Sequence, residues 1–479
     1  MIYIGYVSGA MLALYWLRYL IFKRKEQPFA LPVLFTCLFL PKLKLVEISD
    51  LTTAGIRPDD FLALLLLLIA IMDPDTYRNK HVKRGILLLI ALSVLNLGSV
   101  LVGRMNGYNN NILLSILMVV RKFEYGSFAL TGIYLLKRLK NPYKTFMDEF
   151  TLMSVMHVLL AALQVCGKLT YIVSGYDEYN FFDRIAVSTF NGYYEYGQFL
   201  CFGCAVFLCD YLRNKSWRSL AMVPVSVVML YFSKSRSSLV IGILLLGLIV
   251  YLPVRGKISR RKLALGAFGM IGVAMAGTVL LTGIVGGKTV GRFGTLKIEE
   301  YLIYWKSIVK RGYFDEYVKY LKELVWELDI IGFQGYLDKI TDWSMAIRFY
   351  KWGAVLDGLR HYPVLGYGTG VTHVMDGNYL KLLAETGIFG TALWLFFYGY
   401  YMRAVYKLRK VSQLAKPVLL IMISILLNSV LIDMFEASKP MEMLWLMIGA
   451  VIAYEGQKQS QRSKAFQCVK PLSPASAES

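Results

Sequence analysis

Apolar segments of about twenty residues, interrupted by short polar loops, recur along almost the whole chain. Apolar residues follow one another without interruption in these segments, whereas a half-buried strand would alternate them with polar ones. A helix of this kind can cross a bilayer because it satisfies its own backbone hydrogen bonds. The pattern therefore predicts an all-α, polytopic integral membrane protein.

The pattern also predicts the organisation of the chain. At ~20 residues per span we expect 12–14 transmembrane helices, and thirteen is the best count. Ten of them fall in residues 1–285, a large helical loop follows at 286–376, three spans occupy 377–456, and 457–479 form a polar tail. The expected spans are 1–22, 29–46, 59–73, 85–102, 111–136, 149–173, 193–212, 217–233, 237–254, 263–285, 378–402, 416–434 and 441–455.

Charge predicts the orientation of these spans. The net charge is +21, and most lysines and arginines lie in short loops between apolar segments. Cytoplasmic loops are enriched in these two residues. The basic loops and the C-terminal tail should therefore lie on the cytoplasmic side. The charge therefore does not require a nucleic-acid partner. The basic loops are 74–84, 137–144, 255–262 and 403–416.

The loop 286–376 falls on the opposite, extracytoplasmic side although it carries twelve lysines and arginines. Long loops translocate largely regardless of charge. The basic residues either form a solvated face or attract an anionic partner at the membrane surface, such as a lipid diphosphate. Segments 298–311 and 315–331 show helical spacing of apolar residues and should lie on the bilayer surface or cap the bundle.

Common cofactor motifs are absent from the sequence. It has no P-loop, no nucleotide-binding glycine loop, no HExxH motif and no internal repeat, so we expect no metal and no other cofactor. Cys201 and Cys204 form a CxxC pair, but they lie in an apolar helix without a second ligand pair. This placement favours core packing over a metal or redox site.

Four polar stretches at the expected extracytoplasmic face are candidates for chemistry. The first is Arg184 followed by STFNGYYEYGQFL at 188–200, which places Glu195 in the first turns of a helix. A carboxylate at membrane depth is costly unless it is used or paired. The alternative is an acid favoured by the positive end of the helix dipole.

The second stretch is SKSRSS at 233–238, with Lys234 and Arg236 at the start of a helix. Hydroxyl groups, a guanidinium and backbone N–H groups at a helix N-terminus together suit a phosphate. The alternative is an interfacial arginine that extends its head group to water.

The third stretch places Arg348 and Trp352 four residues apart, on one helical face, with Arg360 further on. The fourth is the Gly-rich turn 363–370, which leads to His373 and Asp376 just before a long apolar helix. Glycines permit positive φ and close approach of the backbone to a ligand.

Three further charges, Arg121, Lys122 and Glu124, fall inside an expected span. Charges at membrane depth mark functional sites by default, but Arg121 and Glu124 are three residues apart and can pair with each other. Function and structure are both open for them.

These motifs resemble the O-antigen polymerase and O-antigen ligase superfamily of bacterial surface-polysaccharide assembly. The similarity lies in STFNGYYEYGQFL, in SKSRSS, in RFYKW…HYPVLGYGTG…DGNYLKLLAETGIFG, and in the plan of many helices with one large outer loop near the C-terminus. It covers about residues 180–400. The resemblance implies a GT-C-like fold.

The resemblance also implies the activity and its location. The protein would be a glycosyltransferase of the bacterial cytoplasmic membrane with an extracytoplasmic active site. Its donor would be a glycan on undecaprenyl diphosphate, and it would need no nucleotide sugar or essential metal. Expected partners are that lipid-linked oligosaccharide, the bilayer, and a chain-length regulator and flippase of the same pathway. Nucleic acid is not an expected partner.

The resemblance assigns roles to individual residues. Arg236 and Arg348 match the arginines that grip the diphosphate. Further contacts to the diphosphate are expected from Lys234, Arg360 and Arg184. Flat apolar faces for sugar rings are expected from Trp352, Tyr194 and Tyr367.

The general base that deprotonates the acceptor hydroxyl is left open among Asp376, His373 and Glu195. Ligases of the superfamily carry a histidine just before the last outer-loop helix, where this chain has Asp376, with His373 one turn earlier. Many polymerases have Asp-Asn there, and this chain has Asp376-Gly377. The difference favours a polymerase over an O-antigen ligase or a protein-glycosylating transferase.

A flippase of lipid-linked glycans is the alternative from another class. It should carry charges along a central transmembrane path and often shows repeated halves. We expect the charges of this chain at the outer face and find no repeat, which favours the enzyme.

Overall fold

The computed structural model describes residues 3–42, 46–47, 55–77, 79–107, 112–171, 184–254, 362–370 and 377–468, with positions 348, 352, 355–356 and 359. Most of these residues are helical, which confirms the all-α prediction. The described residues also contain a two-residue antiparallel ladder that pairs Val46 with Ile56 and Glu47 with Gly55. The expected span at 263–285 and most of the loop 286–376 lie outside the described residues.

The described elements follow one another along the chain in this order. The helices are α1 Ile4–Arg18, the π-helix η1 Tyr19–Lys23, α2 Ala30–Phe39, α3 Pro58–Ile71, α4 Pro74–Tyr77, α5 Lys80–Met105, α6 Ile112–Arg138, α7 Pro142–Val165, α8 Tyr193–Asn214, α9 Trp217–Phe232, α10 Arg236–Val254, α17 Asn378–Leu408, α18 Ala415–Asn428, the 3-10 helix η2 Met434–Glu436, and α19 Ser438–Cys468. The strands are β1 Val46–Glu47 and β2 Gly55–Ile56.

Within the described ranges, four helical segments are long and apolar enough to cross a membrane. They are Ile4–Lys23, α5, α7 and α17. The helices Ala30–Phe39, Trp217–Phe232, Arg236–Tyr251 and Ala415–Asn428 are apolar but shorter. The architecture is therefore compatible with a membrane protein.

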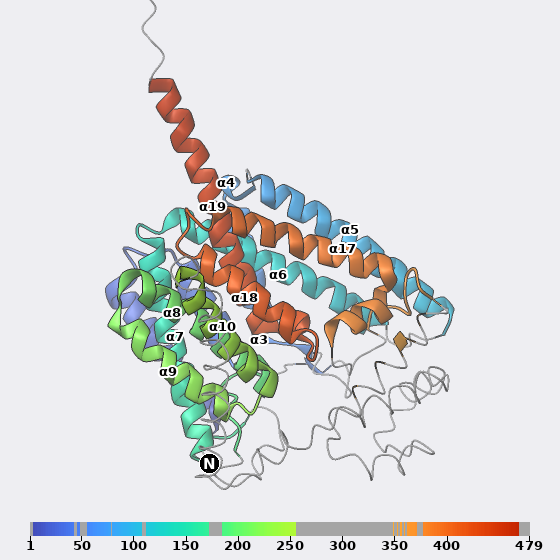
Figure 1. The fold of residues 1–479 in the computed structure, drawn as a ribbon, viewed down its shortest axis with the longest axis horizontal. Coiled ribbons are helices and arrows are strands. Elements are labelled where there is room, and N and C mark those ends of the chain that lie inside the picture. Colours follow the sequence, from blue (N-terminus) through green and yellow to red (C-terminus); the bar gives the residue numbers. More distant parts are fainter. Residues whose placement is uncertain are drawn as a thin grey trace, which may run out of the picture.

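Several predicted boundaries differ from the structure. The expected loop 74–84 contains α4 and the start of α5, because Asn79 caps α5 by accepting a hydrogen bond from the backbone N–H of His81 at 2.9 Å. The expected span 29–46 ends at Phe39, just before Pro41. The expected polar tail begins as helix, since α19 continues to Cys468 and projects beyond its neighbours (Figure 1).

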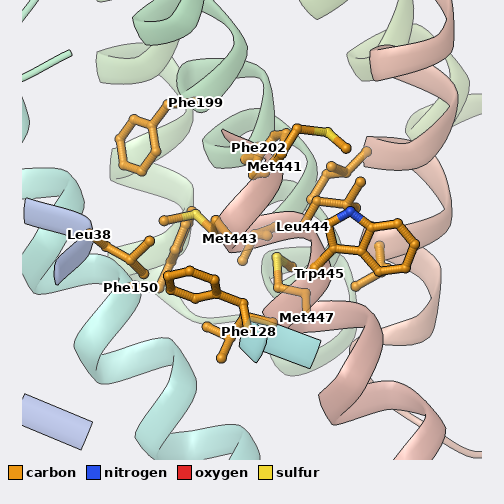
Figure 2. Packing of buried hydrophobic residues seen from close by; sticks show 14 of the residues in the cluster. Leu38, Phe128, Phe150, Phe199, Phe202, Met441, Met443, Leu444, Trp445 and Met447 are labelled. Carbon is orange, nitrogen blue, oxygen red and sulfur yellow. The ribbon is translucent and has the colours of Figure 1, made fainter. Parts of the chain in front are cut away.

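Helix α19 is the central element of the bundle. It contacts α6, α17, α18, α8 and α2, so it joins the α5–α6–α17 group to the α8–α9–α10 group (Figure 1). Figure 2 shows apolar side chains of α19 within the buried hydrophobic cluster, together with side chains from neighbouring helices. The residues of the same cluster that are labelled there are Leu38 of α2, Phe128 of α6, Phe150 of α7, and Phe199 and Phe202 of α8.

Glycines allow the backbones of α6 and α19 to touch. A Cβ atom on Gly132 of α6 would overlap the carbonyl oxygen of Leu446, and one on Gly449 of α19 would overlap that of Ala129. Small residues at such crossings permit close helix packing within apolar surroundings. The sequence places Gly132 and Gly449 in different spans, and only the packing shows that they face the same contact.

Gly449→Ala should lower the free energy of unfolding by about 1–3 kcal/mol, because the added methyl forces α6 and α19 apart. The control is Gly98→Ala in α5, where a Cβ meets nothing within 4 Å. That change should be neutral or stabilise by up to ~1 kcal/mol through helix propensity. Thermal unfolding of both purified variants in the same detergent measures the difference. Equal unfolding midpoints would contradict the close crossing.

Candidate functional site

Charged side chains gather where α3, α8, α17 and α19 begin, and we call this region the polar end of the bundle. Lys42, just after α2, donates to Asp59 Oδ2 of α3 at 2.6 Å and to Glu442 Oε1 of α19 at 2.9 Å. All three side chains are at most 1% exposed. An ammonium between two carboxylates repays much of the desolvation cost of the three charges. The contact ties three elements together.

Lys439 joins the start of α19 to the first sequence motif. Its Nζ donates to the carbonyl oxygen of Thr189 at 2.7 Å and to Thr189 Oγ1 at 2.6 Å, and lies 4.9 Å from the ring centre of Phe190. Thr189 and Phe190 belong to STFNGYYEYGQFL. This contact positions the turn that leads into α8.

A second ion pair lies at the start of α17. Lys381 Nζ is 2.7 Å from Glu436 Oε2 of η2 and 3.5 Å from Asp433 Oδ2. Burial favours the neutral form of Glu436, but the charge of Lys381 outweighs it and holds the pKa of Glu436 below its usual value. The pair therefore links α17 to the connection between α18 and α19.

A third polar group connects α5 and α6 to the Gly-rich turn. Asn96 Oδ1 accepts from Lys122 Nζ at 2.6 Å and from Thr369 Oγ1 at 2.9 Å. Arg121 and Glu124 approach to 3.8 Å, which confirms the pair expected from their spacing. Lys122 and Thr369 of the Gly-rich turn thus donate to the same acceptor, which links α6 to the fourth sequence motif.

The Gly-rich turn fits into a break in α17. Gly387 has φ 65° and ψ −167°, so the helix is interrupted there. The N–H groups of Tyr367 and Gly368 donate to the carbonyls of Ala384 at 2.7 Å and Glu385 at 3.1 Å, before the break. After the break, the N–H of Ile388 donates to Pro363 at 2.9 Å. The turn thereby satisfies backbone groups that the broken helix cannot pair.

A cavity of about 510 Å³ extends inward from the polar end. Tyr194 and Glu195 of the first motif, Thr369 of the Gly-rich turn, and Asn378 at the start of α17 all contribute to its wall. Farther in, its wall is apolar. Those apolar residues include Val82, Ile86 and Leu89 of α5, Phe397 and Tyr401 of α17, and Trp445 and Ile452 of α19.

The second motif packs directly on the first. A Cβ on Gly197 would come within 2.8 Å of the Ser238 side chain and 3.0 Å of Ser235 Cβ. This packing places Arg236, the first residue of α10, beside the start of α8. Lys234 has φ 58°, and its ammonium lies 5.2 Å from the ring centre of Tyr231. Arg236 and Lys234 are both half-buried and are not among the residues of the cavity wall.

The other predicted diphosphate ligands have different surroundings. The guanidinium of Arg184 lies where a Cβ on Gly167 would be, just past the end of α7. A cation there is favoured by the negative end of the helix dipole, and a diphosphate contact of Arg184 stays a prediction. Arg348 is helical and half-buried. Arg360 lies outside the described residues.

The predicted sugar contacts fall into two groups. Tyr194 lies on the cavity wall. Trp352 packs over the start of α17, with its Nε1 3.1 Å from the place a Cβ on Gly377 would take. Tyr367 is 2% exposed and meets Tyr362 edge-on at 5.2 Å between ring centres.

Of the three candidate bases, only Glu195 falls in the described part of the chain. It is 4% exposed and lies on the cavity wall. His373 and Asp376 lie outside the described residues. Cys201 and Cys204 are buried free cysteines of α8.

Sequence reasoning missed several residues of the polar end. Arg57, Lys381 and Glu385 lie on the cavity wall, and Lys42, Glu442 and Lys439 lie around them. We expected the functional charges in loops at the outer face, whereas these charges are buried inside the bundle. Their burial is tolerated because each has an oppositely charged or polar partner nearby. The sequence feature that could have indicated these residues is a charged residue within two turns of the start of an apolar helix.

No protein-family model and no curated protein sequence matches this chain.

Lys42→Met should lower the free energy of unfolding by about 3–5 kcal/mol, because it leaves Asp59 and Glu442 buried without their cation. Lys23→Met is the control, since Lys23 pairs with Glu26 at 3.8 Å on the surface and should cost at most ~1 kcal/mol. Detergent-solubilised protein would be compared by thermal unfolding. Adding Asp59→Asn and Glu442→Gln to Lys42→Met should recover part of the loss. A Lys42→Met variant as stable as the Lys23→Met control would show that the buried pair contributes nothing.

Proposed function

We propose that the protein is a membrane glycosyltransferase that polymerises undecaprenyl-diphosphate-linked oligosaccharide repeat units. One observation carries the proposal: residues of the first and fourth motifs line one cavity, and the second motif packs on the first. The first and fourth motifs are separated by more than a hundred residues of sequence, and a shared reaction centre is a reason for them to meet. O-antigen, capsule and exopolysaccharide assembly all use this reaction.

The proposed reaction transfers a glycan from its lipid carrier to a sugar hydroxyl of another unit. The acceptor oxygen forms a bond to the anomeric carbon, the bond from that carbon to the diphosphate oxygen breaks, and the hydroxyl proton passes to a carboxylate or imidazole base. Glu195 is the base candidate on the cavity wall, and His373 and Asp376 remain the alternatives. Arg236 and Arg348 would stabilise the negative charge on the departing diphosphate.

The proposed location is the bacterial cytoplasmic membrane, with the polar end on the extracytoplasmic side. Two facts support this side. The start of α17, which belongs to the polar end, directly follows the long insert 286–376, the only large polar segment between apolar ones in the sequence. The basic residues Lys137 and Arg138 lie in the last turn of α6. This is the end of the helix away from the polar end. A chain-length regulator and the flippase of the pathway are the proposed protein partners.

A carrier of lipid-linked glycans is the second candidate. Buried charges inside a helical bundle are typical of substrate paths in transporters, and the cavity reaches from Asn378 at the start of α17 to Ile452 far along α19. The two candidates are separated by supplying purified undecaprenyl-diphosphate oligosaccharide to the protein in detergent. Chain growth without a membrane barrier requires a transferase, and a carrier leaves the substrate unchanged.

Arg236→Ala and Arg348→Ala should each abolish long glycan chains while the protein level stays normal, because the departing diphosphate loses a cation. Loss of one such contact costs roughly 100-fold or more in rate. The readout is the chain-length ladder of surface glycan in a deletion strain that carries each variant. The matched control is Arg138→Ala, whose side chain is 58% exposed and pairs with Asp73 at 3.5 Å. A normal ladder in either active-site variant would disprove the diphosphate contact.

A further inference from the structure

Arg57 is a buried arginine with open hydrogen-bonding capacity. It lies just before α3, is 1% exposed and contributes to the cavity wall. Its backbone N–H donates to Asp60 Oδ2 at 2.8 Å, and its Nε lies 4.0 Å from Asp59 Oδ1. Among the described residues, its Nε and Nη2 have no hydrogen-bond partner. Burial of unpaired donor groups is costly, so a polar partner from a ligand would be favoured there.

Glu195 offers the complementary group from another element. Its carboxylate is buried on the same cavity wall. Its Oε2 has no hydrogen-bond partner among the described residues. The positive charges that act on it most strongly are Lys42, Arg57 and Lys439. Lys42 donates to Asp59 and Glu442, and Lys439 donates twice to Thr189, so two of the three donors of each ammonium are engaged within the protein.

Among the described residues, the charges of the cavity wall cancel. Four cations and four carboxylates of this part of the chain belong to the wall, so together they carry no net formal charge. They are Arg57, Arg121, Lys122 and Lys381 against Glu195, Glu385, Asp433 and Glu436. A diphosphate is favoured by an excess of cations, which this wall does not supply. A neutral ligand with many hydroxyl groups can use donors and acceptors together.

Size and aromatic surface agree with such a ligand. The cavity volume of about 510 Å³ lies within the roughly 300–1,000 Å³ of common small-molecule sites. Tyr194, Tyr125, Trp394 and Phe435 belong to the same wall. Aromatic rings present flat apolar faces on which the C–H face of a sugar ring can pack.

We propose that the polar end of the cavity is a binding site for a neutral saccharide, with Arg57 donating to sugar hydroxyls and Glu195 accepting from them. This assignment rests on the proposed transferase function, in which the saccharide is the non-reducing end of the acceptor unit. Arg57 is a binding residue in this site. The diphosphate of the donor is held elsewhere, at Arg236 and Arg348, neither of which belongs to the cavity wall as described.

The test measures binding of free saccharide to the purified full-length protein in detergent. The probes are neutral oligosaccharides from partial acid hydrolysis of the source strain's surface polysaccharide, and inorganic diphosphate. Trp394 and Trp445 lie on the cavity wall, so tryptophan fluorescence reports occupancy. The oligosaccharide should bind saturably, and Arg57→Gln and Glu195→Gln should each weaken binding at least tenfold. Inorganic diphosphate should not displace it.

Two controls guard against loss of folding. Arg138→Gln changes an exposed arginine and should leave oligosaccharide binding unchanged. Arg57→Lys keeps the positive charge but loses the planar fork of donors, so it should fold like the parent protein and still bind several-fold more weakly. Each variant is compared with the parent by its thermal unfolding midpoint.

Several outcomes overturn the assignment. Unchanged oligosaccharide affinity in Arg57→Lys and Glu195→Gln would do so, as would displacement of the oligosaccharide by inorganic diphosphate or a complete lack of oligosaccharide binding. The proposed function is judged separately, by chain growth on lipid-linked oligosaccharide. Chain growth with unaltered saccharide binding in the variants refutes only the saccharide site. Arg57-dependent saccharide binding without chain growth refutes only the transferase.

Discussion

The bundle depends on the pairing of the charges that it buries. Lys42 lies between Asp59 and Glu442 with all three side chains removed from solvent. Each charge alone would be prohibitively costly in that environment, whereas the three together are tolerated. Because the three residues come from the end of α2 and the starts of α3 and α19, their contact sets how these elements meet. The contact thereby fixes the position of Arg57, two residues before Asp59, on the cavity wall.

A broken helix provides the second constraint. The interruption of α17 at Gly387 leaves backbone groups that the Gly-rich turn 362–370 satisfies. Such breaks are tolerated within apolar bundles only where other groups complete the hydrogen bonds. The turn is therefore held against α17, and Thr369 reaches Asn96 and, through it, Lys122. The Gly-rich turn and α17 are separated in the sequence, but these contacts hold them together as one unit of the fold.

At the polar end, side chains with hydrogen-bond partners lie next to polar groups that have none among the described residues. Lys42, Lys439 and Lys381 have hydrogen-bond partners within the protein, so we interpret them as a support. Within the part of the chain that the structure describes, Arg57 Nε and Nη2 and Glu195 Oε2 have no hydrogen-bond partner, and both residues belong to the cavity wall. Preorganised polar groups that need no rearrangement on ligand binding are the usual basis of specific recognition. In our proposal the saccharide binds in the cavity, and the diphosphate binds separately at Arg236 and Arg348.

The sequence by itself determined the helices, since continuous apolar segments bounded by polar turns can satisfy their backbone only as helices. It also singled out Glu195, Arg236 and the Gly-rich turn, because polar groups at the ends of apolar helices are conspicuous. It could not reveal that Gly132 faces α19, that Arg184 packs on Gly167, or that Lys42 joins two carboxylates. Those contacts join residues tens to hundreds of positions apart, and no local pattern encodes their distance. Only the tertiary structure decided which buried charges of the described residues pair with one another.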